Sequence, residues 1–451
     1  MQSQSRELRF PATGAKKKKT QIVIVGGGAA GLELAARLGR RFGRRDHDVI
    51  LVERNRTHVW KPLLHEVATG ALDANIDEVG YRAHCKRWGY RFFNGTLESV
   101  DTEARMIHLA PLVENGRELI GPHSLRYDYL VLAFGSITND FGTPGVAEHC
   151  MALDSRAEAD RFRDRLLNHC LAVSRAMVVD PDSDARVKVS IVGAGATGVE
   201  LAAELFNAAD ALAYYGLEVF DSRRLEVTLI EAGPRILPAL SERLSGAAQR
   251  ELEALGVRVL TNVPVTEVTA DAIVTKSGER IESDLMVWAA GVRATPIAGR
   301  LGALELTRTG QILTTPTLQS VSDPRVFAIG DCASCTLPGS ERPVPPRAQS
   351  AHQMAASVFD NLTRMMSGRP LHDFVYKDHG SLVSLSRYST IGSLMGSLSR
   401  GSLAIEGRIA RFFYTSLYRM HLIAIHGWIR GSALIVTSHV HAILRPRLKL
   451  H

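Results

Sequence analysis

Residues 21–53 read QIVIVGGGAAGLELAARLGRRFGRRDHDVILVE. The apolar, β-branched run 22–25 predicts a short buried strand, which ends at three consecutive glycines. A helical pattern follows from Ala29 to Arg41, and residues 48–53 predict a second strand. A strand, a glycine turn, a helix and a second strand in this order are typical of a βαβ unit at the start of a doubly wound sheet.

The same pattern occurs a second time in the chain. Residues 187–192 predict a strand, 193–198 a glycine turn, 199–213 a helix and 226–231 another strand. The two glycine turns are about 167 residues apart, which is far longer than the repeat of a solenoid. The sequence therefore predicts an α/β chain with two Rossmann-like domains, one of them inserted into the other.

The glycine spacing within the first turn is that of a dinucleotide-binding loop. In Gly26-x-Gly28-x-x-Gly31, the first glycine permits the turn, the second lets the backbone approach a pyrophosphate, and the third lets helix and strand pack closely. Glu53 ends the next strand, where a carboxylate can accept hydrogen bonds from ribose hydroxyls. This context favours nucleotide binding over the alternative of a tight turn beside a surface acid.

The second turn has the same spacing, with its glycines at Gly193, Gly195 and Gly198 and an acid, Glu231, at the end of the following strand. An acid at this position favours NADH, because it would repel the 2′-phosphate of NADPH. Arg235 lies four residues further on and weakens that preference. Glu200 is expected in the first turn of the helix, where one interpretation is that it complements the helix dipole.

Charge is concentrated at the two ends of the chain. Residues 1–19 are net +5 and residues 405–451 are net +6, so the rest of this +7 chain is mildly acidic. Such basic ends suggest a polyanionic partner, either a membrane surface or a nucleic acid. The Lys16–Lys19 run is interpreted as part of a solvated extension. Apolar residues at 45% and charged residues at 22% exclude a mostly disordered chain and a polytopic membrane protein.

Five scattered cysteines argue against a disulfide framework. Cys332 and Cys335 form a Cys-x-x-Cys pair, which leaves three interpretations open: structural thiols, a soft-metal site or a redox pair. No second pair lies nearby to complete a four-ligand zinc site. We therefore assign no residue as a metal ligand, and whether Cys332 and Cys335 bind a metal is left open.

Four further segments carry a family resemblance: VFAIGD (326–331), WAAGVRA (288–294), PPRAQSAHQ (345–353) and YKDHGSL (376–382). Together with the two glycine motifs, they make residues 21–451 resemble the type II NADH:quinone oxidoreductases, especially the respiratory form of Gram-negative bacteria. The resemblance implies a glutathione-reductase-like flavoprotein fold with two dinucleotide-binding domains and a C-terminal amphipathic helical segment that anchors the protein to a membrane.

The resemblance also implies roles for individual residues. Glu200 is expected near the nicotinamide and the flavin, Gln349 on the quinone-facing side of the flavin, and Lys377 near the pyrimidine edge, where a cation stabilises the anionic reduced ring. These three are the predicted catalytic residues. The residues expected to hold non-covalent FAD are Gly26, Gly28, Gly31, Glu53 and Asp331, and those expected to hold NADH are Gly193, Gly195, Gly198, Glu231 and Gly291.

The implied activity is transfer of a hydride from NADH to FAD and then of two electrons to a membrane quinone such as ubiquinone, without proton pumping. The implied location is peripheral, on the cytoplasmic face of a bacterial inner membrane. An anionic lipid surface is the expected partner, nucleic acid is not, and a homodimer is left open. The segment WKPLLHEVATG (60–70) has no cysteine, so a dithiol relay at the flavin is not expected.

Two alternatives remain at this stage. One is a sulfide:quinone-type flavoprotein reductase, which would need paired cysteines at the flavin. The other is a non-enzymatic flavoprotein that senses NADH.

The predicted organisation divides the chain into four parts. Residues 1–19 form the extension, 20–150 with 286–355 the FAD domain, 151–285 the NADH domain, and 356–451 the quinone-side and membrane-binding region.

From residue 403 onward no run of 18 apolar residues occurs, which argues against a transmembrane helix. On a helical projection the cations share an arc of about 100°, opposite most of the large apolar side chains. The cations are Arg408, Arg411, Arg419 and Arg430, and the apolar residues are Phe413, Leu417, Met420, Ala424 and Trp428. This pattern predicts interfacial helices; the alternative is a basic helix docked on the protein body or on a partner.

Overall fold

The computed structural model describes residues 6–7, 19–43, 47–214, 220–295, 297, 300–385, 389–395 and 402–444. Lys16, Lys17 and Lys18 of the predicted basic extension lie outside the described residues. The chain divides into two compact units. The first comprises Met1–His58, Glu78–Ile137 and Arg293–Lys377, and the second Val59–Asp77, Thr138–Val292 and Asp378–His451.

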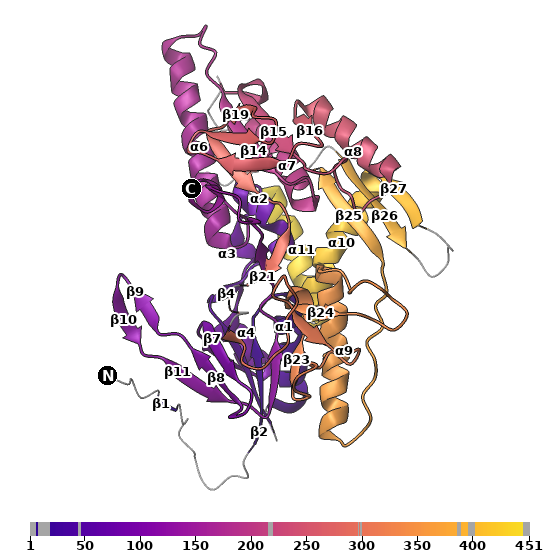
Figure 1. Ribbon diagram of the computed structural model, residues 1–451. Coiled ribbons are helices and arrows are strands. Elements are labelled where there is room, and N and C mark those ends of the chain that lie inside the picture. Colours follow the sequence, from indigo (N-terminus) through magenta and orange to yellow (C-terminus); the bar gives the residue numbers. More distant parts are fainter. Residues whose placement is uncertain are drawn as a thin grey trace. The chain divides into compact units, whose positions relative to one another are not determined.

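A parallel sheet of five strands forms the centre of the first unit, in the order β23-β12-β2-β3-β6 (Figure 1). Its strands are β2 (Thr20–Val25), β3 (His47–Glu53), β6 (Arg91–Asn94), β12 (Tyr129–Leu132) and β23 (Val326–Ala328). Ile22 pairs with Val49 on one side and with Tyr129 on the other. The apolar run 22–25 is buried as predicted, because a parallel strand in mid-sheet is covered on both faces.

Three longer helices accompany this sheet: α1 (Ala29–Leu38), α4 (Tyr81–Trp88) and α9 (Ala348–Met366). The predicted helix 29–41 is α-helical to Leu38 and continues as a π-helical turn over Gly39–Gly43. Helices α1 and α9 pack against each other, as Figure 1 shows. A 3₁₀ turn over Gly330–Cys332 follows β23.

Smaller strands complete the first unit. A four-stranded sheet contains β1 (Arg6–Glu7), β11 (His123–Arg126), β8 (Met106–Leu109) and β7 (Leu97–Asp101). Three pairs are β9 (Leu112–Glu114) with β10 (Arg117–Ile120), β4 (Thr57–His58) with β5 (Val79–Gly80), and β22 (Ile312–Thr314) with β24 (Ala333–Cys335). Strands β13 (Ser136–Thr138) and β21 (Val292–Ala294) lie where the chain passes from one unit to the other.

The second unit repeats the parallel sheet with four strands, in the order β16-β15-β14-β20. They are β14 (Val187–Val192), β15 (Leu225–Ile230), β16 (Arg258–Leu260) and β20 (Leu285–Trp288). An antiparallel sheet of β17 (Val265–Val268), β18 (Ala272–Thr275) and β19 (Arg280–Glu282) accompanies it. The strand predictions at 187–192 and 226–231 are therefore confirmed to within one residue.

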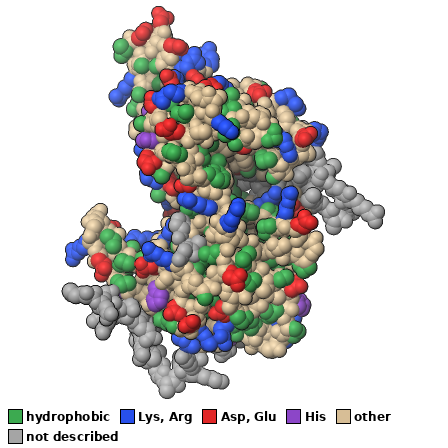
Figure 2. Space-filling model, in the orientation of Figure 1, with side chains coloured by type: hydrophobic (Ala, Val, Ile, Leu, Met, Phe, Trp, Pro, Cys, Tyr) green, Lys and Arg blue, Asp and Glu red, His purple; other side chains and the backbone are tan. Residues whose placement is uncertain are grey.

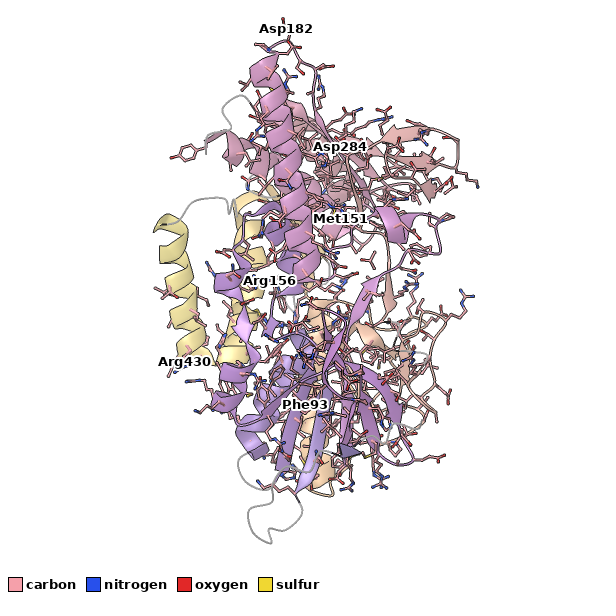
Figure 3. All side chains as sticks on the ribbon, turned by 90° about the vertical axis from the view of Figure 1, so that its left-hand side faces the viewer. Phe93, Met151, Arg156, Asp182, Asp284 and Arg430 are labelled. Atoms are coloured by element: carbon pink, nitrogen blue, oxygen red, sulfur yellow. The ribbon has the colours of Figure 1, made fainter. Side chains whose placement is uncertain are left out.

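The helices of the second unit are α2 (Leu64–Thr69), α3 (Ala74–Asp77), α5 (Val146–His149), α6 (Arg156–Val179), α7 (Ala196–Tyr214) and α8 (Glu242–Leu255). Ser155 caps the start of helix α6: the backbone N–H of Glu158 donates to Ser155 Oγ, and the Glu158 carboxylate accepts from the backbone N–H of Asp154. Figure 3 shows the length of α6, from Arg156 to the loop that carries Asp182.

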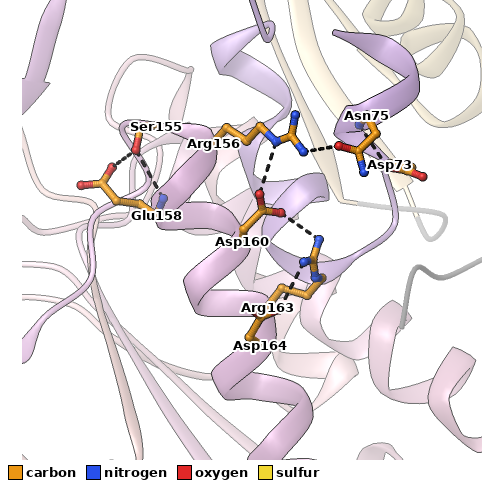
Figure 4. A network of polar contacts seen from close by, with 8 residues as sticks. All are labelled: Asp73, Asn75, Ser155, Arg156, Glu158, Asp160, Arg163 and Asp164. Atoms are coloured by element: carbon orange, nitrogen blue, oxygen red, sulfur yellow. Dashed lines mark hydrogen bonds and ion pairs between the residues drawn. The ribbon is translucent and has the colours of Figure 1, made fainter. Parts of the chain in front are cut away.

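A polar network at the start of α6 fastens the segment that follows α2 (Figure 4). The Arg156 guanidinium donates to Asn75 Oδ1 and to Asp160, and Asp160 also pairs with Arg163. Arg163 is buried, so its charge requires these partners. The segment 59–77 therefore belongs to the second unit through α2 and α6.

The C-terminal part forms an antiparallel sheet followed by two helices. Its elements are β25 (Gly380–Leu385), β26 (Ser389–Met395), β27 (Ser402–Glu406), α10 (Gly407–His426) and α11 (Trp428–Leu444). Gly427, with φ +77°, separates α10 from α11. The single helical arc predicted across this region was wrong, because the left-handed residue resets the direction of each side chain beyond it.

The exposed and buried faces of α10 also differ from the prediction. Met420, expected on the apolar face, is 64% exposed, whereas Leu422 is buried. His421 stacks on Trp60 with ring centroids 3.9 Å apart, so this face of α10 packs on the unit itself. The side chains of Arg408, Arg411, Phe413 and Leu417 lie outside the described residues. Among the described helices, none is long and apolar enough to cross a membrane.

Candidate functional site

The first glycine turn leaves an open space in front of its middle glycine. Gly26 adopts φ +102°, and a Cβ on Gly31 would lie 1.9 Å from the Gly26 carbonyl oxygen, so neither position accepts a side chain. At Gly28, in contrast, a Cβ would meet no protein atom within 4 Å. Gly28 is the N-cap of α1, and the first turn of α1 contains no acid. An anionic group can therefore approach the amides at the start of α1.

Two side chains fix this turn. Glu53 Oε2 accepts a hydrogen bond from the backbone N–H of Gly27 at 2.8 Å, and the Tyr81 hydroxyl donates to the Gly27 carbonyl at 2.7 Å. Burial raises the pKa of Tyr81 well above its usual value, so the hydroxyl keeps its proton and remains a donor. The sequence did not predict the role of Tyr81, because the glycine motif gives no sign that a residue 54 positions away contacts Gly27.

The second glycine turn repeats this geometry in the second unit. Gly193 adopts φ +100°, a Cβ on Gly198 would lie 2.0 Å from the Gly193 oxygen, and a Cβ on Gly195 would meet nothing within 4 Å. Glu231 holds the turn as Glu53 holds the first one: its Oε2 accepts from the backbone N–H of Ala194 at 2.9 Å. In both turns the acid therefore also orders the loop.

Arg235 does not weaken the preference for NADH over NADPH that is expected from Glu231. Its guanidinium donates to the carbonyl oxygens of Leu240 and Pro238, at 2.7 and 3.0 Å. Because these bonds direct the cation into its own loop, Arg235 would not compensate the repulsion between the Glu231 carboxylate and a 2′-phosphate.

Asp331 lies at the carboxyl edge of the first parallel sheet, directly after β23 and at the same edge as the first glycine turn. Its carboxylate accepts a hydrogen bond from the Ser136 hydroxyl at 2.8 Å, and its carbonyl accepts from Gln311 Nε2 at 2.9 Å. The tertiary structure of the first unit thus brings together Gly26, Gly28, Gly31, Glu53 and Asp331 along one edge.

Glu200 is a buried carboxylate, 7% exposed. Helix α7 begins at Ala196, so Glu200 lies in its second turn, and the expectation that it complements the helix dipole from the first turn was wrong. Glu200 Oε1 accepts from the backbone N–H of Ser384 at 3.1 Å, and Oε2 lies 3.6 Å from His65 Nδ1. Burial lowers the pKa of His65 to about 4, so this imidazole is neutral near pH 7.

Gln349 and Gln353 occupy one face of α9, and both bind the backbone of Lys377. Gln353 Nε2 donates to the Lys377 carbonyl at 2.8 Å, and Gln353 Oε1 accepts from the Lys377 N–H at 2.9 Å. Gln349 Nε2 donates to the same carbonyl at 3.1 Å. The structure therefore brings Gln349 and Lys377 together within the first unit, with Gln353 as a clamp that the sequence did not assign.

A second contact joins α9 to α1. Glu33 is 2% exposed and pairs with Arg37 at 2.6 Å and with His352 of α9. A buried carboxylate needs such partners. Because α1 begins at the first glycine turn and α9 carries Gln349, this contact links the two parts of the site in the first unit.

Comparisons with known proteins agree with this geometry. The family model described as pyridine nucleotide-disulphide oxidoreductase matches residues 20–355. A protein of Haemophilus influenzae named type II NADH:quinone oxidoreductase is 44% identical over 442 residues, which are 95% of this chain and 99% of that protein. A protein of the same name from Staphylococcus aureus is 28% identical, over 86% of this chain and 92% of its own length.

The chain belongs to the type II NADH:quinone oxidoreductases, within the pyridine nucleotide-disulphide oxidoreductase family. A solved structure, described as NDH2 from Plasmodium falciparum in complex with NADH, has the same fold, with a TM-score of 0.79 and 19% identity over 96% of this chain and 100% of that one. The predicted family and fold class are thereby confirmed.

The residues fit the two dinucleotides that a type II NADH:quinone oxidoreductase uses. Each unit has a glycine turn with open space at the middle glycine and an acid at the end of the next strand. FAD is the cofactor and NADH the reductant, as the sequence predicted.

The two cysteines after Asp331 are buried thiols in this family member. Cys332 Sγ donates to the carbonyls of Leu132 and Ile329, and Cys335 Sγ to that of Thr315. Burial raises the pKa of Cys332 to about 12 and also raises that of Cys335, so both remain protonated near pH 7. Of the three interpretations, this environment favours structural thiols. No cluster of three metal-ligating side chains occurs among the described residues.

Proposed function

We propose that this chain oxidises NADH and reduces a membrane quinone to the quinol, without moving protons across the membrane. The observation that carries the proposal is the pair of matching glycine turns, each with its own acid, in a chain that is 44% identical over nearly its full length to a type II NADH:quinone oxidoreductase. Bound FAD supplies the two-electron chemistry between NADH and the quinone; the chain places and orients the reactants.

The proposal gives tasks to seven of the predicted residues. The turn at Gly28 receives the FAD pyrophosphate and Glu53 the ribose of its adenosine. Gly195 and Glu231 do the same for NADH. Lys377, held by Gln353, stabilises negative charge on the reduced ring, and Gln349 lies on the quinone side. Glu200 is the buried carboxylate of the second unit that we assign to the nicotinamide and flavin.

The two alternative functions make different demands: a sulfide:quinone-type reductase needs reactive cysteines, and an NADH sensor needs no catalytic turnover. A sulfide:quinone-type reductase needs reactive cysteine pairs at the flavin, but Cys332 and Cys335 are buried protonated thiols and residues 59–77 contain no cysteine. A sensor would bind NADH without turnover. The decisive experiment is steady-state oxidation of NADH by the purified holoprotein with a short-chain quinone, with NADPH and sulfide as competing donors. Binding of NADH without quinone reduction would refute the proposed activity.

Replacement of Gln349 by alanine should separate the two half-reactions. The Gln349 amide donates to the Lys377 carbonyl, so its loss should disturb the quinone side of the first unit and leave the NADH turn of the second unit intact. We expect flavin reoxidation by quinone to slow about tenfold, equivalent to about 1.4 kcal/mol, with flavin reduction by NADH nearly unchanged. Stopped-flow absorbance of both half-reactions measures this. Equal slowing of both would place Gln349 in general support of the flavin.

The membrane contact, in this proposal, is made by the exposed apolar side chains of α11. Trp428 is 74% exposed, Ile429 84% and Val436 63%. Arg430 lies among them at the start of α11, as Figure 3 shows. Charged groups of both signs are scattered over the face of the molecule seen in Figure 2. The three apolar side chains are exposed on one helix, α11. A basic residue among apolar ones suits an anionic bilayer surface. We place the protein peripherally on the cytoplasmic face of a bacterial inner membrane.

A triple substitution of Trp428, Ile429 and Val436 by serine should weaken binding to anionic liposomes by more than tenfold, because burial of each large apolar side chain contributes about 1.5–3 kcal/mol. Oxidation of NADH with a water-soluble acceptor should persist, whereas activity with a long-tailed quinone should fall.

The matched control is a double substitution of Val113 and Leu119 by serine. These residues are exposed at 54% and 52% on the β9–β10 hairpin of the other unit. Liposome co-sedimentation should not distinguish this variant from the wild type. Equal binding by the α11 variant would move the anchor elsewhere.

A further inference from the structure

An exposed aromatic ring in the second unit is held in a costly backbone conformation. Phe141 is 65% exposed and adopts φ +53°, the left-handed region that residues with a bulky side chain avoid. Two side-chain bonds stabilise this loop: Asn139 Oδ1 accepts from the backbone N–H of Phe141 at 3.0 Å, and Asp140 Oδ1 accepts from that of Gly142 at 3.1 Å. Strain of this kind persists where the surrounding structure enforces it, which is common at ligand sites.

The loop is fastened to the end of β20. Trp288 Nε1 donates to the Asn139 carbonyl at 2.8 Å, and the Asn139 N–H donates to the Gly291 carbonyl at 3.4 Å. The Phe141 ring lies directly over Gly291, where a Cβ would be 2.5 Å from Phe141 Cζ. Gly291 itself has φ +64°. The ring therefore stands beside the turn that follows β20, with much of its surface in solvent.

The order of the strands gives the direction in which a dinucleotide would cross this edge. The three neighbouring parallel strands β15, β14 and β20 end at the same edge of the sheet. Glu231 follows β15, the glycine turn follows β14, and Gly291 follows β20. If Glu231 binds the adenosine ribose and the turn at Gly195 the pyrophosphate, the remaining half of the ligand continues toward β20.

We propose that Phe141 binds the nicotinamide half of NADH, with its ring packed against the nicotinamide riboside over the Gly291 turn. This inference rests on the proposed use of the second unit for NADH. An aromatic ring that is already exposed and fixed loses little conformational freedom on binding, and stacking removes apolar surface of both partners from water. Phe141 thereby recognises the half of the ligand that Glu231 does not reach.

The test compares two ligands that share the adenosine half. In a Phe141→Ala holoprotein we expect the KM for NADH to rise about five- to tenfold, the range expected from loss of one aromatic contact. The inhibition constant of ADP, which lacks the nicotinamide half, should stay unchanged. Phe141→Tyr, which keeps the ring, should restore the KM.

The matched control is Tyr214→Ala, which removes an aromatic side chain that is 79% exposed at the end of α7 in the same unit. This variant should keep the wild-type KM for NADH and the wild-type inhibition constant of ADP. Equal weakening of NADH and ADP by Phe141→Ala would mean that Phe141 only supports the fold of the unit, and unchanged binding of both would mean that it does not touch the ligand; either result overturns the inference. Absence of NADH oxidation in the wild type would instead refute the proposed function.

Discussion

Replacement of Gly28 by valine is expected to give a folded protein that no longer retains FAD. Gly28 has φ −67° and ψ −166°, a conformation open to any residue, and a Cβ there meets no protein atom within 4 Å. The valine methyl groups would instead occupy the space in front of α1 that the pyrophosphate needs. A clash of this size costs about 3 kcal/mol, or roughly 100-fold in affinity.

Flavin absorbance of the purified variant, normalised to protein, measures the loss. Far-ultraviolet circular dichroism should remain that of the wild type. Gly31→Val makes the contrast, because its Cβ would lie 1.9 Å from the Gly26 oxygen and should destabilise the fold itself. If the Gly28→Val protein kept its full flavin content, the first turn would not be the FAD site.

The same substitution at Gly195 should give the opposite phenotype. Its φ lies outside the left-handed region, and a Cβ there also meets no protein atom within 4 Å, so the second unit should fold. We expect this variant to keep FAD but to lose reduction of the flavin by NADH by about 100-fold or more, since the open space at α7 is filled.

Anaerobic stopped-flow reduction by NADH measures this loss. Dithionite should still reduce the flavin of the variant, and a quinone should still reoxidise it, because neither reaction uses the second turn. Each variant thus serves as the control of the other. Loss of flavin from Gly195→Val, with NADH affinity retained in Gly28→Val, would show that the two units are assigned the wrong way round.

The C-terminal helices show where a sequence pattern is insufficient. A helical projection assumes one uninterrupted helix, but Gly427 ends α10 in a left-handed conformation and α11 starts anew. The projection also had no information on which face of α10 meets the rest of the unit. His421 is buried and stacks on Trp60, more than 350 positions away in the sequence.

The sequence by itself determined the two glycine turns, the strands and helices beside them and the acids that follow, and its likeness to a family pointed to the activity. These features are encoded within about 30 neighbouring residues: apolar runs make buried strands, and only glycine permits the tight turn and close packing at Gly26 and Gly31.

Only the tertiary structure decided which distant groups complete the sites. Tyr81 reaches Gly27, Gln353 clamps Lys377, Glu200 meets Ser384, and Phe141 covers Gly291. For the buried groups Tyr81 and Glu200, the physical reason is that a buried polar group must find a partner wherever the fold supplies one. Local periodicity carries no record of that partner, because it acts through space and not along the chain.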